Sequence, residues 1–270
     1  MFSAVTFALC MTQIAAGKVI PAAAPAPIAQ PAATASATAA SPGADRQFDF
    51  EIADFRILQN KDVQKDMGIT EDQRKSMNAE ADKFNSELKV LDAAYAKAKE
   101  SDPNAKPPTD KLSTLQNKLK SQILSGLGAA QLTRLREITI QGAGDLALLD
   151  PRVGKVIGLS DAQTKSLRSR WDTNSKKAQE LTKKGAAIEQ AALKPLFEKY
   201  KNTKPKDEAE AKARQTEANN ALKSHESELK PIQKQIGDLQ ADFLQLVKST
   251  LDEKQKKAYE NLRGKQFKTG

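Results

Sequence analysis

The sequence predicts an all-α protein in which two tandem helical hairpins, built from long antiparallel helices with coiled-coil-like seams, follow a disordered N-terminal tether. Charged residues make up 29% of the 270 residues and aromatic residues only 5%, a composition typical of long helices. Apolar residues recur at steps of three and four, the period of an α-helix. A ten-residue pattern also returns along the chain, which indicates a duplicated architecture.

Residues 1–20 resemble a signal peptide. The apolar stretch "MFSAVTFALCMTQIAAG" has the length of a signal-peptide core and is too short to span a bilayer as a helix. Small residues at 15–17 and 22–24 offer cleavage sites, whereas the usual positively charged start is missing. We expect an exported protein, periplasmic or secreted, without a transmembrane span once this segment is removed. A short membrane anchor and a plain disordered tail are the alternatives.

Residues 21–47 are expected to be a disordered linker. Positions 21–44 contain 5 Pro, 12 Ala and no charged residue, so this stretch cannot bury a core. Cys10 is the only cysteine and lies in the segment before the linker. Disulfides therefore neither stabilise the mature chain nor report its compartment.

Residues 48–147 are expected to form the first hairpin unit. Prolines at 103, 107 and 108 interrupt the helical pattern and place the hairpin tip near residues 101–108. The outgoing helix carries an apolar seam at alternating steps of four and three, and the return helix carries a second one. Their members are Met77, Ala81, Phe84, Leu88, Leu91, Tyr95 and Ala98, then Leu112, Leu115, Leu119 and Ile123.

Residues 148–270 repeat this plan at greater length. The segment 201–206, "KNTKPK", is the expected tip of the second hairpin. Pro195 and Pro231 fall inside its arms and are expected to bend or divide them. The return arm shows the same heptad-like spacing through Leu222, Leu229, Ile232, Ile236, Leu239, Phe243 and Leu246.

The repeated pattern is expected to start helices. "GITEDQRKSM" at 68–77 returns as "GLSDAQTKSL" at 158–167, with weaker relatives at 126–135 and 250–259. A hydroxyl or carboxylate at the cap accepts from the amide three residues on, and the glutamine there reaches back to the cap amide. A ligand contact through these side chains is the alternative interpretation. The capping residues are Thr70, Gln73, Gln131, Ser160, Gln163, Asp252 and Gln255.

The spacing of the repeats indicates that the second hairpin is the longer one. The interval from Gln73 to Gln131 is 58 residues, and that from Gln163 to Gln255 is 92 residues. The extra residues, shared between two arms, would lengthen the second hairpin by roughly 25 Å at the rise of an α-helix.

The residues offer little for catalysis, so we do not expect an enzyme and expect neither a cofactor nor a metal. His225 is the only histidine and is interpreted as a solvated helix residue. Gly142 and Gly144 follow no predicted strand and do not make a phosphate loop. The net charge of +9 is spread over helices of mixed sign, which argues against specific nucleic-acid binding.

A few apolar residues outside the seams are candidates for contact with another polypeptide. Trp171, the only tryptophan, packs in the core or serves as a solvent-facing anchor, since aromatic side chains are favoured at binding hot spots. The other candidates are Phe50, Phe55, Ile140 and Phe267.

The segments "ITEDQ" (69–73), "LSDAQ" (159–163) and "LDEKQ" (251–255) resemble the LTxxQ motif of the Spy/CpxP family. Members of this family are exported all-helical proteins that chaperone unfolded polypeptides or sense envelope stress. The blocks "VQKDMGITEDQ" and "AAQLTRLREI" are similar to those of tandem exported proteins for which the resemblance implies no activity. This chain departs from the family in its size, its duplication and its long second hairpin.

Two functions remain open on the sequence. One is a periplasmic chaperone or stress-related binder whose helical surface holds unfolded polypeptides loosely, as the resemblance implies. The other is a structural coiled-coil scaffold of the cell envelope, in which the long hairpin engages an envelope protein or the cell wall. The sequence does not fix the oligomeric state.

Overall fold

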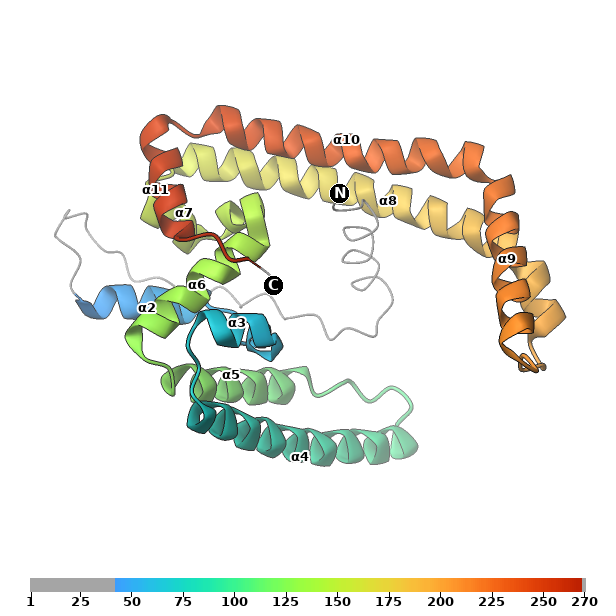
Figure 1. Cartoon of the computed structure of the whole chain (residues 1–270), viewed down its shortest axis with the longest axis horizontal. Coiled ribbons are helices and arrows are strands. Elements are labelled where there is room, and N and C mark those ends of the chain that lie inside the picture. The colour runs from blue at the N-terminus through green and yellow to red at the C-terminus, as the bar shows by residue number, and fades with distance from the viewer. Residues whose placement is uncertain (1–41, 269–270) are drawn as a thin grey trace. The chain divides into compact units, whose positions relative to one another are not determined.

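The computed structural model describes residues 42–268, with side chains from residue 46 onward (Figure 1). Within this range the elements are helices, and no strand occurs, which confirms the all-α prediction with two hairpins. The signal-peptide-like segment 1–20 and the linker up to residue 41 lie outside the described residues. No helix of the described range is both long and apolar enough to cross a membrane.

The folded part begins earlier than residue 48. Helix α2 spans Pro42–Ile52, so the last residues assigned to the linker are helical. Proline suits the first turn of a helix because the amide it lacks would have no partner there. Tertiary contacts also favour the helix, since Asp49 on α2 is buried and pairs with Arg136. Propensity alone could not have shown this contact between distant residues.

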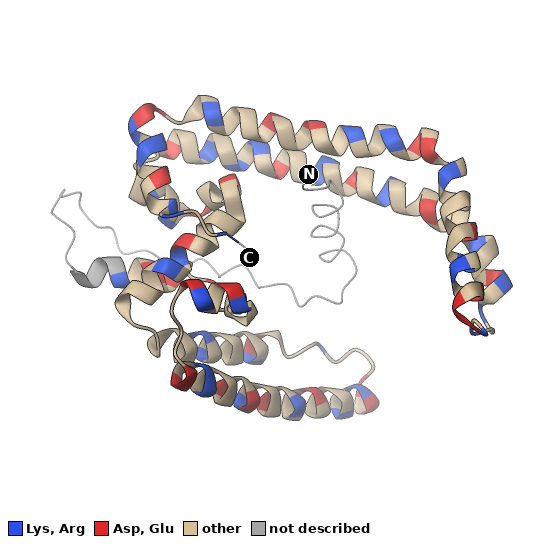
Figure 2. Cartoon of the chain, viewed as in Figure 1, with Lys and Arg blue, Asp and Glu red and all other residues tan. Residues whose placement is uncertain are grey.

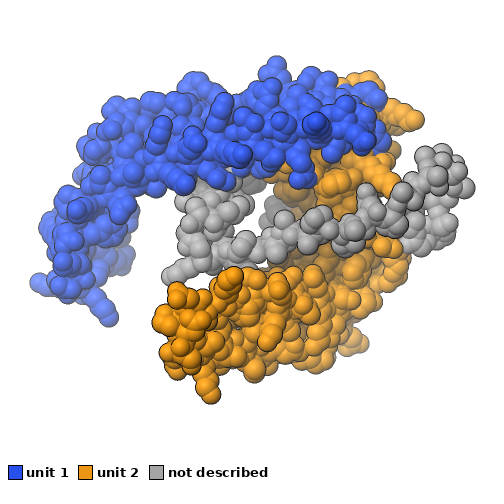
Figure 3. Space-filling model, turned by 180° about the vertical axis from the view of Figure 1, so that it is seen from behind, with its two compact units in different colours: residues 1–22, 158–252 blue, residues 23–157, 253–270 orange. Residues whose placement is uncertain are grey.

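The described chain divides into two compact units, which Figure 3 colours separately. Unit 1 contains residues 158–252, and unit 2 contains residues 42–157 together with 253–268. This division differs from the predicted one in two ways. The boundary follows residue 157 rather than residue 147, and residues 253–268 belong with the first hairpin rather than with the second. The physical reason is that the last helix, α11 (Glu253–Arg263), packs on α6 (Ala129–Ala143) and α7 (Pro151–Ile157).

Unit 2 holds the first hairpin and the apolar core cluster. Its hairpin consists of α4 (Glu71–Ser101) and α5 (Thr109–Ser125), with the tip between them as expected. Short elements precede and follow it: η1 (Phe55–Gln59), α3 (Lys61–Asp66) and η2 (Gly144–Leu149). The core cluster is made of Ala53, Leu58, Val63, Met67, Leu119, Ile123, Leu124, Leu127, Leu132, Leu135 and Ile138.

Unit 1 is the second hairpin. Helix α8 (Asp161–Tyr200) runs out, and α9 (Glu208–Ser224) and α10 (Glu226–Thr250) return along it. The chain stays helical through Pro195, and the end of α8 turns with α9 away from the line of α10 (Figure 1). The return arm divides at His225 rather than at Pro231, which lies in the second turn of α10.

A buried polar contact fixes the register of α8 against α10. Asn174 is 6% exposed and donates from Nδ2 to the Leu239 carbonyl at 2.9 Å and to Asp242 Oδ2 at 2.8 Å. Arg170 reaches Asp242 Oδ1 at 2.7 Å. The hydrogen bonds from Asn174 and Arg170 lower the pKa of the Asp242 carboxyl. Trp171 packs edge-on against Phe243 in the same region, with ring centroids 5.4 Å apart.

The duplication is longer than the ten-residue pattern. An Asx cap, a short helix with a buried valine and a glycine of positive φ precede both long outgoing helices. Asn60 caps α3 and Asp150 accepts from the Arg152 amide at the start of α7. Gly68 has φ 60° and Gly158 has φ 80°, a conformation in which other residues are strained. The chain thus turns from the short helix into the long one in the same way twice.

We expect Gly158→Ala to destabilise unit 1 by about 1–2 kcal/mol, because the added Cβ is strained at positive φ even though no atom lies within 4 Å of it. Gly237→Ala, in the interior of α10 and equally open, is the matched control and is expected to stabilise by about 0.5–1 kcal/mol. Urea unfolding of both variants measures the difference. Equal effects of the two substitutions would contradict the role assigned to Gly158.

Candidate functional site: the base and open seam of the first hairpin

The predicted motif residues lie at helix N-termini. Thr70 Oγ1 accepts from the Gln73 amide at 3.2 Å, and Gln73 Oε1 accepts from the Thr70 amide at 3.0 Å. Ser160 and Gln163 make the same reciprocal bonds, at 3.2 Å and 2.9 Å. At the start of α6, Gln131 Oε1 accepts from the Gly128 amide at 2.9 Å, with no hydroxyl opposite it. These residues satisfy amides that the helix itself leaves unpaired.

The fourth motif occupies the corresponding position at the last helix. Asp252 directly precedes α11, and Gln255 lies in its first turn and is 7% exposed as a residue. All four motifs therefore stand where a helix begins.

The glutamines have a second role, which the sequence did not reveal. Gln73 and Gln131, here called the glutamine pair, are 58 residues apart and hydrogen-bond to each other through both amide groups, at 2.8 Å and 3.1 Å. Gln73 Nε2 also donates to the Gly126 carbonyl at 3.0 Å, and Gln131 Nε2 to the Gly68 carbonyl at 3.2 Å. Each glutamine thus binds the carbonyl two residues before the other motif's cap.

This arrangement explains why glutamine rather than glutamate occupies the motif. A primary amide has two N–H donors and an oxygen that accepts twice. Gln73 uses its full capacity. Its oxygen accepts from the Thr70 amide and from Gln131 Nε2, and its nitrogen donates to the Gly126 carbonyl and to Gln131 Oε1. A carboxylate could complete the capping box but could not donate across the base of the hairpin.

The second hairpin is closed by a related bond. Gln163 Nε2 donates to the Thr250 carbonyl at 2.7 Å, over a separation of 87 residues. Thr250 precedes the cap residue Asp252 by two positions, as Gly126 precedes Gly128. The alignment of the four motifs could have suggested this pairing, since each hairpin begins and ends with one.

We expect Gln73→Glu to separate the two roles. The variant keeps the acceptor for the Thr70 amide and loses the donors to Gly126 and Gln131, so we expect a loss of about 1–2 kcal/mol of unfolding free energy at neutral pH. Thr70→Ala, which removes only the cap, is the comparison and is expected to lose about 1 kcal/mol. Denaturant unfolding measures both, and a Gln73→Glu variant as stable as the parent would contradict the bridging role.

Beyond this closed base, the α4–α5 hairpin has an open seam. The predicted seam residues of α4 face α5, yet no residue of α4 is fully buried. Phe84, Leu88, Leu91 and Tyr95 are all partly exposed, and Leu112 and Leu115 on α5 are as well. A two-helix layer can cover only one side of its own seam. Apolar surface therefore remains accessible along the hairpin.

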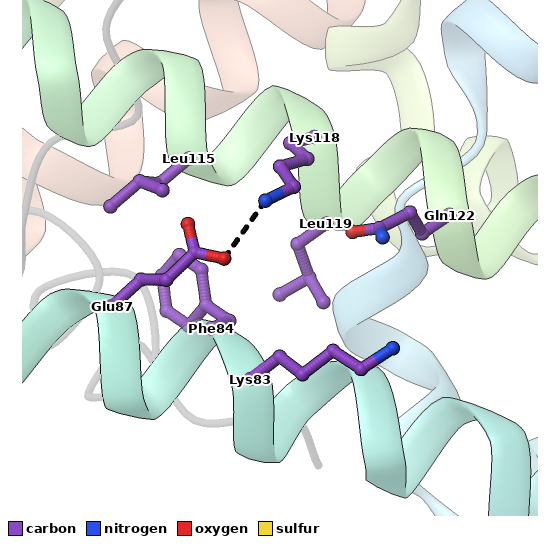
Figure 4. A pocket seen from close by; sticks show the side chains of 7 residues that line it. All are labelled: Lys83, Phe84, Glu87, Leu115, Lys118, Leu119 and Gln122. Carbon is purple, nitrogen blue, oxygen red and sulfur yellow. Dashed lines mark hydrogen bonds and ion pairs between the residues drawn. The ribbon is translucent and has the colours of Figure 1, made fainter.

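A shallow hollow lies in this seam, and we call it the hairpin hollow (Figure 4). Phe84 from α4 and Leu115 and Leu119 from α5 form its apolar part, and Leu119 is itself a member of the core cluster. Lys83, Glu87, Lys118 and Gln122 complete the lining. Glu87 and Lys118 form an ion pair of 2.8 Å between the two helices, drawn as a dashed line in Figure 4.

A second depression continues the hairpin hollow toward the glutamine pair. It shares Gln122 with the first and is lined by Gln73, Met77, Ile123 and Leu127 among others. The two depressions thus follow the seam from the hairpin base outward. Their shallow shape and mixed apolar and polar lining suit a flexible, weakly held polypeptide segment better than a small molecule that needs an enclosed pocket.

Helix α6 connects the hairpin base to the C-terminal residues. Arg136 is buried, pairs with Asp49 at 2.8 Å and donates to the Leu262 carbonyl. Gln141 donates to the Lys265 carbonyl at 2.8 Å and accepts from the Phe267 amide at 2.7 Å. Residues 253–268 are therefore an integral part of unit 2.

Tyr259 provides a titratable contact in this region. Its hydroxyl donates to the Gly144 carbonyl at 2.6 Å, and burial together with nearby Asp145 raises the pKa of the phenol to about 12. The ordinary value is 10, so the folded state holds the proton more tightly than the unfolded chain. The resulting stabilisation is complete below pH 10 and is lost as the pH rises toward 12.

We expect Tyr259→Phe to lower the free energy of unfolding by about 1 kcal/mol at neutral pH, because the Gly144 carbonyl loses its donor. The difference between parent and variant should shrink between pH 10 and 12, where the parent tyrosine begins to ionise. Unfolding by guanidinium at several pH values measures this. A difference that stays constant to pH 12 would contradict the raised pKa.

The predicted polypeptide-contact residues have mixed positions. Phe50, Phe55 and Phe267 are partly buried and pack against the core cluster of unit 2. Ile140 is buried at 1% exposure. Trp171 is partly buried and contacts Phe243. Among residues 46–268 the most exposed large apolar side chains are others: Val90, Val156, Phe197 and Leu244.

Several titratable residues of the described range form structural pairs. Burial would raise the pKa of the Asp54 carboxyl, but hydrogen bonds from the side chain and backbone of Arg56 outweigh it and lower the pKa. His225 Nδ1 lies 2.9 Å from Glu228 Oε1 at the break between α9 and α10. Within residues 46–268 no group of three or more His, Cys, Asp or Glu side chains could hold a metal ion.

No family model, no curated protein and no solved structure matches the chain. Its function is therefore inferred from its own residues and geometry.

Proposed function

We propose that the protein is an exported, non-catalytic binder of unfolded polypeptides, a chaperone of the Spy/CpxP kind. The observation that carries the proposal is the open seam of the α4–α5 hairpin, whose apolar residues are partly exposed along the length of the helices. The motif-level resemblance to the LTxxQ proteins and the signal-peptide-like start support it independently.

The geometry of the hairpin hollow suits weak and unselective binding. Phe84, Leu115 and Leu119 offer an apolar surface without an enclosed cavity. Lys83 and Glu87 from α4 and Lys118 from α5 border this surface with charges of both signs. A polypeptide held this way keeps its own conformational freedom, which lowers the entropic penalty of binding.

An aggregation assay tests the proposal. The full chain is added at near-equal concentration to a protein that aggregates on refolding, and light scattering is followed at several ionic strengths. We expect suppression by the parent and a loss of most of it in Leu115→Gln, which polarises the hairpin hollow. Val90→Gln is the matched control, because Val90 is 72% exposed on α4 and does not line the hollow.

Helicity by circular dichroism shows whether Leu115→Gln keeps its fold. Absence of suppression by the parent at every ionic strength would refute chaperoning and favour the alternative, a coiled-coil scaffold of the envelope. Equal suppression by Leu115→Gln and Val90→Gln would place the binding surface elsewhere on the chain.

A further inference from the structure

The second hairpin carries a surface of a different kind near its tip. Residues 183–206 include seven lysines and two glutamates, which gives a net charge of +5 over 24 positions. Phe197 lies in this segment and is 64% exposed. Every other aromatic residue of the described range is buried or only partly exposed.

Three of the seven lysines and the exposed phenylalanine lie on one face of α8 and its C-cap, and Figure 2 shows basic residues recurring along this helix. Steps of three and four residues place side chains on one side of a helix. The face so defined, here called the α8 stripe, contains no acidic residue and consists of Lys183, Ala186, Gln190, Lys194, Phe197 and Lys201. All six are exposed.

Three glutamates of α9 near the tip are paired with basic residues. On the side facing α9, Glu217 pairs with Lys199 at 2.9 Å, and Glu210 pairs with Arg214 at 2.5 Å. Glu208 pairs with Lys212 on α9 itself. On α8, Glu198 pairs with Lys201, but both side chains are 60% exposed, and such surface pairs contribute little.

We propose that the α8 stripe and the adjoining tip bind the surface of an anionic phospholipid bilayer. Lys183 and Lys194 have no ion-pair partner within the described residues, and Lys204 at the tip has none either. Lysines near such a surface are attracted by its negative potential, and long lysine stems let the ammonium groups reach the phosphates. Phe197 can then enter the headgroup boundary, where aromatic side chains are favoured.

A bilayer fits this face better than an acidic protein does. The six residues of the stripe are all exposed on the outer surface of one helix, and none of them lines either depression of the first hairpin. A single exposed aromatic residue between lysines instead matches a surface that is charged outside and apolar beneath. This function is additional to the proposed binding of unfolded polypeptides, which lies on the other hairpin.

Vesicle co-flotation of the full chain tests the proposal. We expect binding to phosphatidylglycerol–phosphatidylcholine vesicles that falls with added salt, and much weaker binding to phosphatidylcholine alone. The uncharged segment 1–17 would bind both kinds of vesicle alike, so the preference for the anionic vesicles reports on charged residues. Equal partition of the parent into the two kinds of vesicle would overturn the proposal.

The variant Lys194→Glu, Lys201→Glu is expected to bind anionic vesicles about 25-fold more weakly, since each of the two lysines contributes about fivefold to the affinity. Lys89→Glu, Lys97→Glu is the matched control, because it changes the net charge equally with two exposed lysines of α4. The control is expected to lose much less binding. Equal losses in both variants would show a general charge effect and overturn the assignment to the α8 stripe.

Phe197→Trp adds a local readout that does not depend on loss of binding. The variant contains a tryptophan at position 197 in addition to Trp171, so its spectrum is compared with that of the parent, which has Trp171 alone. The added fluorescence should shift to shorter wavelength with anionic vesicles and be quenched by brominated lipid. An unchanged spectrum with bound vesicles would refute insertion at this site. Binding to soluble polyglutamate with none to vesicles would assign the stripe to an acidic polypeptide instead.

Discussion

The pairing of Gln73 with Gln131 is the interaction on which the architecture of unit 2 depends most directly. It ties the start of α4 to the start of α6, across the whole first hairpin, and leaves neither amide with an unused donor. Because each glutamine also caps its own helix, the same side chain sets where a helix begins and where the hairpin closes. In unit 1, Gln163 likewise caps its own helix and donates to the Thr250 carbonyl at the end of the return arm.

A closed base leaves the remainder of the first hairpin with few constraints. The core cluster lies near the base, and the α4–α5 seam further out is only half covered. The hairpin hollow joins these two regions, because Leu119 belongs to the core cluster and Phe84 packs against it. The apolar surface accessible along the seam is therefore continuous with the packing that holds the fold.

The two hairpins differ in what their outer parts present. The first offers the hairpin hollow, with leucine and phenylalanine bordered by charges of both signs. The second offers the lysine-rich α8 stripe with Phe197. Duplication followed by divergence of the faces, with the motifs that start the helices retained, accounts for both the internal likeness and the difference.

The sequence by itself determined the helical class, the two hairpins, their tips and the helix starts at the four motifs, because helical periodicity, prolines and capping side chains act over a few residues. The tertiary structure alone decided that Gln73 meets Gln131, that the C-terminal helix belongs to unit 2 through Arg136 and Gln141, and that Phe50, Phe55 and Phe267 pack against the core. These contacts join residues far apart in the chain, and local patterns carry no information about which distant partner fills a hydrogen bond or covers an apolar face.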